Sequence, residues 1–158
     1  MEPTTLKLRE GGIADIDAFT RLVNTAFAVE RFILDEERID QGQCAGLFRT
    51  GKILLAEQDR SLVGGVYLEL RDASGYLGLL SVEPSRQRQG IGRHLVNTAE
   101  NWFRSQRRSI VQLQIINVRR ELLDVYRRPG YRETGTSPFP PDLATHLPCH
   151  FIKMTKCL

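Results

Sequence analysis

The chain has 158 residues, of which 41% are hydrophobic and 26% are charged, a composition that fits one folded domain over residues 1–158 and excludes global disorder. No apolar run approaches the ~18–20 residues of a membrane span, and the N-terminus lacks a secretory signal, so we expect a cytoplasmic protein without membrane contact. The net charge of +3 hides an uneven distribution: residues 1–85 sum to −5, residues 86–132 to +8 and residues 133–158 to zero.

In the first half of the chain, the spacing of apolar residues changes from strand to helix and back to strand. Alternation over residues 4–9 predicts a first strand. Asp15 is positioned to cap a helix with apolar residues at 3-and-4 spacing, and Asp35–Leu47 is predicted as a second helix. Three strand-like runs separated by polar turns then predict an antiparallel meander: Ile53–Glu57, Leu62–Leu70 and Tyr76–Val82.

The second half alternates between helices and strands. An amphipathic helix is predicted from Ile91 to Gln106, and the elements expected after it are the strand Ser109–Ile116, the short helix Glu121–Arg128 and the strands Tyr131–Thr136 and His150–Thr155. The resulting order, β-α-α-β-β-β-α-β-α-β-β, predicts one α+β domain. We expect a mixed, mostly antiparallel sheet of six to seven strands with about four helices.

The loop between the third of these meander strands and the long helix has the features of an anion site. The first-turn N–H groups of a helix and its dipole attract negative charge. Gly90 and Gly92 would let a phosphate approach the backbone, and Arg86, Arg88 and Arg93 add positive charge. A glycine turn with solvated arginines would have the same sequence, because an isolated Gly-x-Gly is a weak signal. Neither a P-loop nor a complete dinucleotide-binding fingerprint is present.

Two motifs resemble the GNAT superfamily, the acyl-CoA-dependent N-acyltransferases. Gln87–Gly92 matches the family pattern Gln/Arg-x-x-Gly-x-Gly/Ala between the fourth strand and the third helix. Asn117, Tyr126 and Gly130–Tyr131 match the later pattern of a strand ending in Asn, a short helix with a Tyr and a glycine–aromatic pair. The similar order of elements covers nearly the whole chain. Pro129 departs from the aliphatic residue that is more usual before Gly130.

The resemblance implies acetyl-CoA as cosubstrate and assigns roles to individual residues. Backbone amides of the loop would bind the CoA pyrophosphate: Gln87, Arg88, Gln89, Gly90, Ile91, Gly92 and Arg93. The strand edge at Leu80 and Val82 would pair with the pantetheine arm where the fourth and fifth strands splay apart, and the Leu80 N–H would bind the oxyanion. Asn117 would hydrogen-bond the pantetheine, and Tyr126 would protonate the leaving thiolate. From position alone, Tyr126 also suits a core residue and Asn117 a helix cap.

The acceptor side is less specific. The fourth strand lacks the Glu that serves as base in some family members, so Glu69 or Glu30, acting through water, is the expected base; each also suits a solvated surface charge. The residues expected to line the acceptor pocket are Phe32, Tyr67, Glu69 and Tyr76. The acidic first half suits a cationic amine, whereas Arg31 would suit an amine with a carboxylate. We expect a small-molecule amine.

The cysteines and arginines bear on the alternatives. Cys44, Cys149 and Cys157 are predicted to be free thiols outside the signature segment, so no covalent intermediate is expected, and no zinc spacing involves them, so no metal is expected. Three arginine pairs suggest nucleic-acid binding, but no binding module accompanies them, so no nucleic-acid partner is expected. A CoA-binding module without catalysis is the other alternative. We therefore expect an N-acetyltransferase, monomeric or homodimeric, that works by direct attack in a ternary complex.

Overall fold

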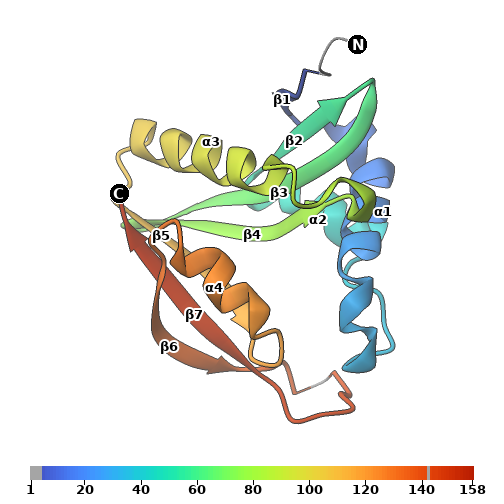
Figure 1. Cartoon of the computed structure of the whole chain (residues 1–158), viewed down its shortest axis with the longest axis vertical. Helices are drawn as coiled ribbons and strands as arrows, with labels where there is room; N and C mark the ends of the chain where they lie inside the picture. The colour runs from blue at the N-terminus through green and yellow to red at the C-terminus, as the bar shows by residue number, and fades with distance from the viewer. Residues whose placement is uncertain (1–4, 142) are drawn as a thin grey trace.

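The elements of the computed structural model follow the predicted order (Figure 1). The structure describes residues 5–141 and 143–158. Its strands are β1 (Lys7–Glu10), β2 (Lys52–Gln58), β3 (Ser61–Arg71), β4 (Ser74–Val82), β5 (Ile110–Ile116), β6 (Arg132–Pro138) and β7 (His150–Cys157). Its helices are α1 (Ile16–Ala26), α2 (Gln41–Thr50), α3 (Ile91–Ser105) and α4 (Glu121–Arg127), with 3-10 turns η1 (Ile13–Asp15), η2 (Ala28–Phe32) and η3 (Pro84–Arg86). The α+β prediction is confirmed, although Thr4, in the first predicted strand, lies outside the described residues.

The seven described strands form one sheet in the order β1-β2-β3-β4-β5-β7-β6. Neighbouring strands are antiparallel except β4 and β5, which run parallel. β4 and β5 pair only near their beginnings, at Gly75 with Val111 and at Tyr76 with Gln112. Beyond these two pairs the strands separate, and the candidate site lies at this separation.

Helices cover both faces of the sheet, so the protein has two hydrophobic cores. α1 and α2 pack on one face, while α3 and α4 pack on the other (Figure 1). Two adjacent glycines of β3 let both layers come close. A Cβ atom on Gly64 would lie 2.9 Å from Ile91 of α3, and one on Gly65 would lie 2.7 Å from Phe19 of α1. No helix in the described part of the chain is long and apolar enough to cross a membrane.

Two details of the helix starts differ from the predictions. The predicted start of the second helix at Asp35 is wrong, because α2 begins at Gln41. Asp40 accepts the Gln43 N–H at 2.7 Å, and the Gln43 side chain accepts the Asp40 N–H at 2.9 Å, so a capping box fixes the start. Asp15 does precede α1, but its carboxylate makes no cap there. Instead it binds Arg9 at 2.7 Å.

A buried carboxylate on α3 was not predicted. Glu100 is 3% exposed and lies among the core residues of that helix. It accepts hydrogen bonds from the Tyr131 hydroxyl at 2.9 Å and from Lys156 Nζ at 2.9 and 3.1 Å. Burial, reinforced by Glu100, raises the pKa of Tyr131, so this hydroxyl remains a donor. The three side chains tie α3 to β7 and to the residue before β6.

The variant Lys156→Met tests this network. It would leave the Glu100 carboxylate buried without its cation, and removing one partner of a buried ion pair typically costs about 3 kcal/mol of unfolding free energy. Urea denaturation at pH 7 measures the loss. Lys153→Met, at an exposed position of the same strand, is the control and should change the stability by less than about 0.5 kcal/mol. Equal losses in the two variants would contradict a stabilising role of the network.

Candidate active site

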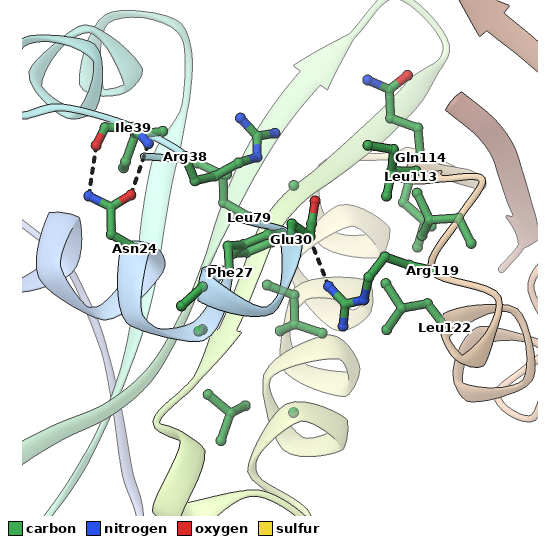
Figure 2. A pocket seen from close by; sticks show the side chains of 18 of the residues that line it. Asn24, Phe27, Glu30, Arg38, Ile39, Leu79, Leu113, Gln114, Arg119 and Leu122 are labelled. Atoms are coloured by element: carbon green, nitrogen blue, oxygen red, sulfur yellow. Dashed lines mark hydrogen bonds and ion pairs between the residues drawn. The ribbon is translucent and has the colours of Figure 1, made fainter. Parts of the chain in front are cut away.

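The separation of β4 and β5 borders a cavity of about 2420 Å³. Its walls include much of β4, the beginning of α3, the end of β5 and part of α4. Figure 2 shows part of this lining, with Leu79 of β4 on one side and Leu113, Gln114 and Leu122 on the other. A typical small-molecule pocket has ~300–1,000 Å³. The cavity is therefore large enough for a long ligand together with a second molecule.

A bulge in β4 lies in the wall of this cavity. The pairing register with β3 shifts, so that Leu79 and Leu80 both face Val66. Leu79 has a φ of 52°, in the left-handed region that side chains rarely adopt, and its carbonyl accepts the Ser81 hydroxyl at 2.9 Å. A bulge interrupts regular pairing and redirects backbone groups. It thus occurs at Leu80, the predicted oxyanion donor.

The predicted anion loop enters α3 through two residues with left-handed backbones. Arg88 has a φ of 65°, and Gly90, at the N-cap of α3, has a φ of 83°. No side chain among the described residues caps α3, so its first-turn N–H groups are available to an anion. A Cβ atom on Gly92 would meet no described atom closer than 3.6 Å, so this glycine leaves room beside the backbone. The loop therefore suits a phosphate.

The loop residues that line the cavity are Gln87, Arg88, Gly90, Ile91, Gly92 and Arg93. Gln89, which the sequence placed with them, lies outside this lining. On β4, Leu80 and Val82, the positions predicted to pair with the pantetheine, both line the cavity.

α4 brings Tyr126 to the cavity. The side chain is 8% exposed, and its ring packs edge-on against Tyr131 with 5.9 Å between the centroids. Burial raises the pKa of Tyr126 to about 12, so the phenol keeps its proton at neutral pH. Tyr126 is thus a core residue, as its sequence position suggested, that also lines the cavity.

Asn117 follows β5 as predicted, but it lies outside the cavity lining. Its Oδ1 accepts the His150 N–H at 2.9 Å, and its own N–H donates to the His150 carbonyl at 2.9 Å. The helix-cap alternative is wrong, because Arg120 occupies the N-cap position of α4. Asn117 fixes the β5–α4 connection to the beginning of β7, and only its amide nitrogen is left to serve a ligand.

An ion pair in the cavity wall joins the two halves of the chain. Glu30 in η2 accepts a hydrogen bond from Arg119 at 2.8 Å, and the side chains are only 17% and 16% exposed (Figure 2). Burial raises the pKa of Glu30, although Arg119 acts in the opposite direction. The alternative of a solvated loop charge is therefore wrong for Glu30.

Three of the four predicted acceptor residues, Tyr67, Glu69 and Tyr76, line a second cavity of about 280 Å³. The Tyr67 hydroxyl lies 2.6 Å from Thr50 Oγ1 and donates to Glu69 Oε2 at 2.7 Å. Arg71 donates to the other Glu69 oxygen at 3.1 Å. Burial alone would raise the pKa of Glu69, but the hydrogen bonds from Tyr67 and Arg71 outweigh burial and lower it. This carboxylate therefore stays ionised.

The connection between α1 and α2 differs from the prediction. Phe32, expected in the acceptor pocket, is 54% exposed and lies outside both cavity linings. Arg31 pairs with Glu37 at 3.1 Å. Arg38, which no sequence pattern distinguished from its charged neighbours, lines both cavities, and its guanidinium carbon lies 5.6 Å from the centre of the Phe27 ring.

Several arginines that suggested nucleic-acid binding are engaged within the protein. Arg119 binds Glu30 and also Glu121, the latter at 2.6 Å. Arg127 pairs with Glu133, and Arg108 donates to the Arg71 carbonyl at 3.3 Å. These side chains hold elements together, which accounts for part of the positive charge between residues 86 and 132.

A comparison with protein-family models assigns the fold to a known family. The model of the acetyltransferase (GNAT) domain matches residues 30–151, more than three quarters of the chain. The chain belongs to the GNAT family of acetyltransferases. The matched region contains the anion loop, the bulge of β4 and Tyr126. The chain is therefore an N-acetyltransferase enzyme of the class that uses acetyl-CoA.

Solved acetyltransferases share the fold of this GNAT enzyme at low sequence identity. The ribosomal-protein-alanine N-acetyltransferase from Brucella melitensis is 21% identical, with a TM-score of 0.78 over 96% of this chain and 99% of that one. The IAA acetyltransferase from Bacillus cereus is 17% identical, with a TM-score of 0.75 over 98% and 100%. The yncA protein from Salmonella typhimurium, solved with its cofactor acetyl-CoA, is 17% identical, with a TM-score of 0.75 over 97% and 94%. No curated protein matches the chain in sequence.

Within the described residues, no group of three or more His, Cys, Asp and Glu side chains is arranged to hold a metal ion. The thiols of Cys44, Cys149 and Cys157 are free. His146 pairs with Asp35 at 3.0 Å.

The variant Gly90→Ala tests the loop of this GNAT acetyltransferase. A Cβ atom there would meet nothing within 4 Å, so the penalty is the left-handed backbone, which costs about 1–2 kcal/mol for a residue with a side chain. We expect the affinity for acetyl-CoA, measured by calorimetry, to fall about tenfold as the loop relaxes. Gly46→Ala in α2, where the space is also open, is the control. Unchanged affinity in Gly90→Ala would argue against a pyrophosphate site at the loop.

Proposed function

We propose that this enzyme transfers the acetyl group of acetyl-CoA directly to the primary amine of a small molecule in a ternary complex. One observation carries the proposal: the separation of β4 and β5, the anion loop and Tyr126 border a single cavity. An extended thioester would run from residues 87–93 along Leu80 and Val82 to Tyr126. The amide-bearing pantetheine would pair with β4 as an added strand does.

The nitrogen of the ammonium acceptor loses two protons, and the sulfur gains one. The ammonium first gives a proton to the base, and the neutral nitrogen attacks the carbonyl carbon of the thioester. A new N–C bond forms, the nitrogen loses its second proton, and the C–S bond breaks. One of the two protons balances the proton delivered to sulfur, and the other passes to solvent. The Leu80 N–H would donate to the carbonyl oxygen as it becomes negative. Tyr126 would give its proton to the leaving sulfur, and its pKa of about 12 keeps that proton in place until the sulfur departs.

Of the two candidate bases, Glu30 suits proton removal better. A general base works best when its pKa lies near the working pH. Burial raises the pKa of Glu30, whereas hydrogen bonds from Tyr67 and Arg71 outweigh burial and lower that of Glu69. We therefore assign Glu30 as the base that removes the amine proton through water. Glu69, in the small cavity, would position the acceptor.

Two features support direct transfer to a small amine. None of the three cysteines belongs to either cavity lining, so no thiol is placed to form an acyl-enzyme. The second cavity, of about 280 Å³, borders the large one at Gly78 and Leu79. A compact acceptor in the second cavity would therefore lie beside the bulge of β4.

The variant Tyr126→Phe removes the proposed acid and keeps the ring. We expect kcat to fall about 100-fold, since general acid catalysis typically contributes ~10²–10⁴-fold, while the dissociation constant of acetyl-CoA stays within about twofold. Steady-state thiol release and calorimetry measure the two quantities. Tyr131→Phe is the matched control: its hydroxyl binds Glu100, so it should lower stability and leave kcat unchanged.

The pH dependence of kcat also tests the assignment of Tyr126 as the acid. With a pKa of about 12, Tyr126 does not ionise below pH 10, so kcat of the wild-type enzyme should show no fall near pH 10 from loss of its proton. An unchanged kcat in Tyr126→Phe would remove this residue from the mechanism.

The variants Glu30→Gln and Glu69→Gln separate the two carboxylates. A base must be ionised, so kcat should rise with pH through the raised pKa of Glu30. In Glu30→Gln we expect this rise to disappear and kcat to fall about 10–100-fold. Glu69→Gln should keep the rise and increase the KM of the acceptor. The reverse pattern would make Glu69 the base.

A further inference from the structure

We infer that the small cavity selects an acceptor that carries a carboxylate near its primary amine, and that Arg38 binds this carboxylate. The acceptor class would then be a free amino acid or a related small amino carboxylate. The inference rests on the proposed function, because it concerns the acceptor of the same reaction.

The net charge of the residues that line the small cavity favours an anionic group on the ligand. Its charged lining residues are Arg38, Arg71 and Glu69, which sum to +1. Arg71 and Glu69 neutralise one another at 3.1 Å. The charge that remains for a ligand is therefore the guanidinium of Arg38. A positive lining disfavours an acceptor with only cationic groups and favours one with an anionic group.

Arg38 is free to bind such a group. It makes no ion pair with a described carboxylate, and its guanidinium rests on the Phe27 ring at 5.6 Å from the centroid. A guanidinium presents its donors as a planar fork that matches a carboxylate in bidentate geometry. The acceptor's carboxylate would supply the partner that the fold does not.

The position of Arg38 fits a short distance between the carboxylate and the amine. Arg38 lines both cavities, together with Gly78 and Leu79, and Figure 2 shows it beside Leu79. Its charge also counteracts the rise in pKa that burial gives Glu30 and Tyr76. A ligand with its carboxylate on Arg38 would therefore hold its amine near the β4 bulge, close to the proposed base.

Most acidic side chains that line the large cavity have partners within the fold, and Glu36 is the exception among the described residues. Asp17 pairs with Arg21 at 3.1 Å, and Glu37 pairs with Arg31 at 3.1 Å. Asp40 caps α2. Most carboxylates around the large cavity are thus engaged locally, whereas Arg38 forms no ion pair with a described carboxylate.

The test compares matched acceptors in a thiol-release assay with acetyl-CoA. Each α-, β- and γ-amino acid is paired with its carboxamide and with the amine that lacks the carboxyl group, and an alanine tripeptide represents a protein N-terminus. The wild-type enzyme is compared with Arg38→Gln and Arg38→Lys. Arg49→Gln is the control, since Arg49 is exposed on α2 and lies outside both linings. Calorimetry with acetyl-CoA is run on every variant.

We expect at least one amino acid to exceed its carboxamide and its decarboxylated amine by tenfold or more in kcat/KM. Arg38→Gln should abolish this preference mainly through KM, with acetyl-CoA affinity within twofold of wild type. Arg38→Lys should retain part of the preference, and Arg49→Gln all of it.

Three results would overturn the inference. They are equal or better acetylation of the carboxamide, amine or tripeptide, an undiminished preference in Arg38→Gln, and acetyl-CoA binding with no amino acid acetylated. A wild-type enzyme that neither binds acetyl-CoA nor releases thiol would instead refute the proposed function, and the inference with it.

Discussion

The arrangement of the whole site depends on where β4 and β5 stop pairing. They pair at two residue positions only. Beyond these, β4 stays paired with β3 and β5 with β7, but the edges that β4 and β5 turn toward each other are unpaired and border the cavity. Backbone N–H and C=O groups must find partners elsewhere when a ladder ends. A ligand that carries amides along its length would supply them, so we propose the missing part of the ladder as the binding feature. The bulge at Leu79 and Leu80 redirects the backbone within this stretch.

The contacts around the separation hold it open and give it two chemically different sides. α3 begins beside β4 and presents the N–H groups of its first turn, while α4 brings the protonated Tyr126 phenol from the β5 side. The Glu30–Arg119 pair links η2 with the β5–α4 connection. On the α2 side, the hydrogen-bonded chain of Thr50, Tyr67 and Glu69 borders a separate, smaller cavity. The anionic cosubstrate and the amine would thus approach the bulge from different cavities.

The parts of this structure that depend on local sequence were predictable. Alternating and helical spacings gave the strands and α3, and the glycine loop could be located because it combines several features within a few residues. The start of α2 was missed because the capping box at Asp40 and Gln43 outweighs the apolar spacing before it. Glu30 and Arg119 were beyond prediction as a pair, since they lie 89 residues apart in the chain. Arg38 was missed for the same reason: only the folded chain shows which of several charged loop residues lacks an ionic partner.

The charge distribution along the sequence agrees with the place of the anion loop in the cavity wall and does not specify the acceptor. Arg88 and Arg93 do line the cavity beside the anion loop. Most acidic side chains of the first half cap helices or form local ion pairs. The summed charge of this segment therefore says little about the acceptor. Net charge over a segment therefore predicts a partner only where the fold leaves that charge unpaired.

A crystal structure of the enzyme with acetyl-CoA tests the central claim most directly. We predict the pyrophosphate within hydrogen-bond distance of the N–H groups of residues 87–93, the pantetheine between β4 and β5 beside Leu80 and Val82, and the sulfur next to the Tyr126 hydroxyl. Density for acetyl-CoA at any other place, or a complex in which β4 and β5 pair along their length, would contradict the claim.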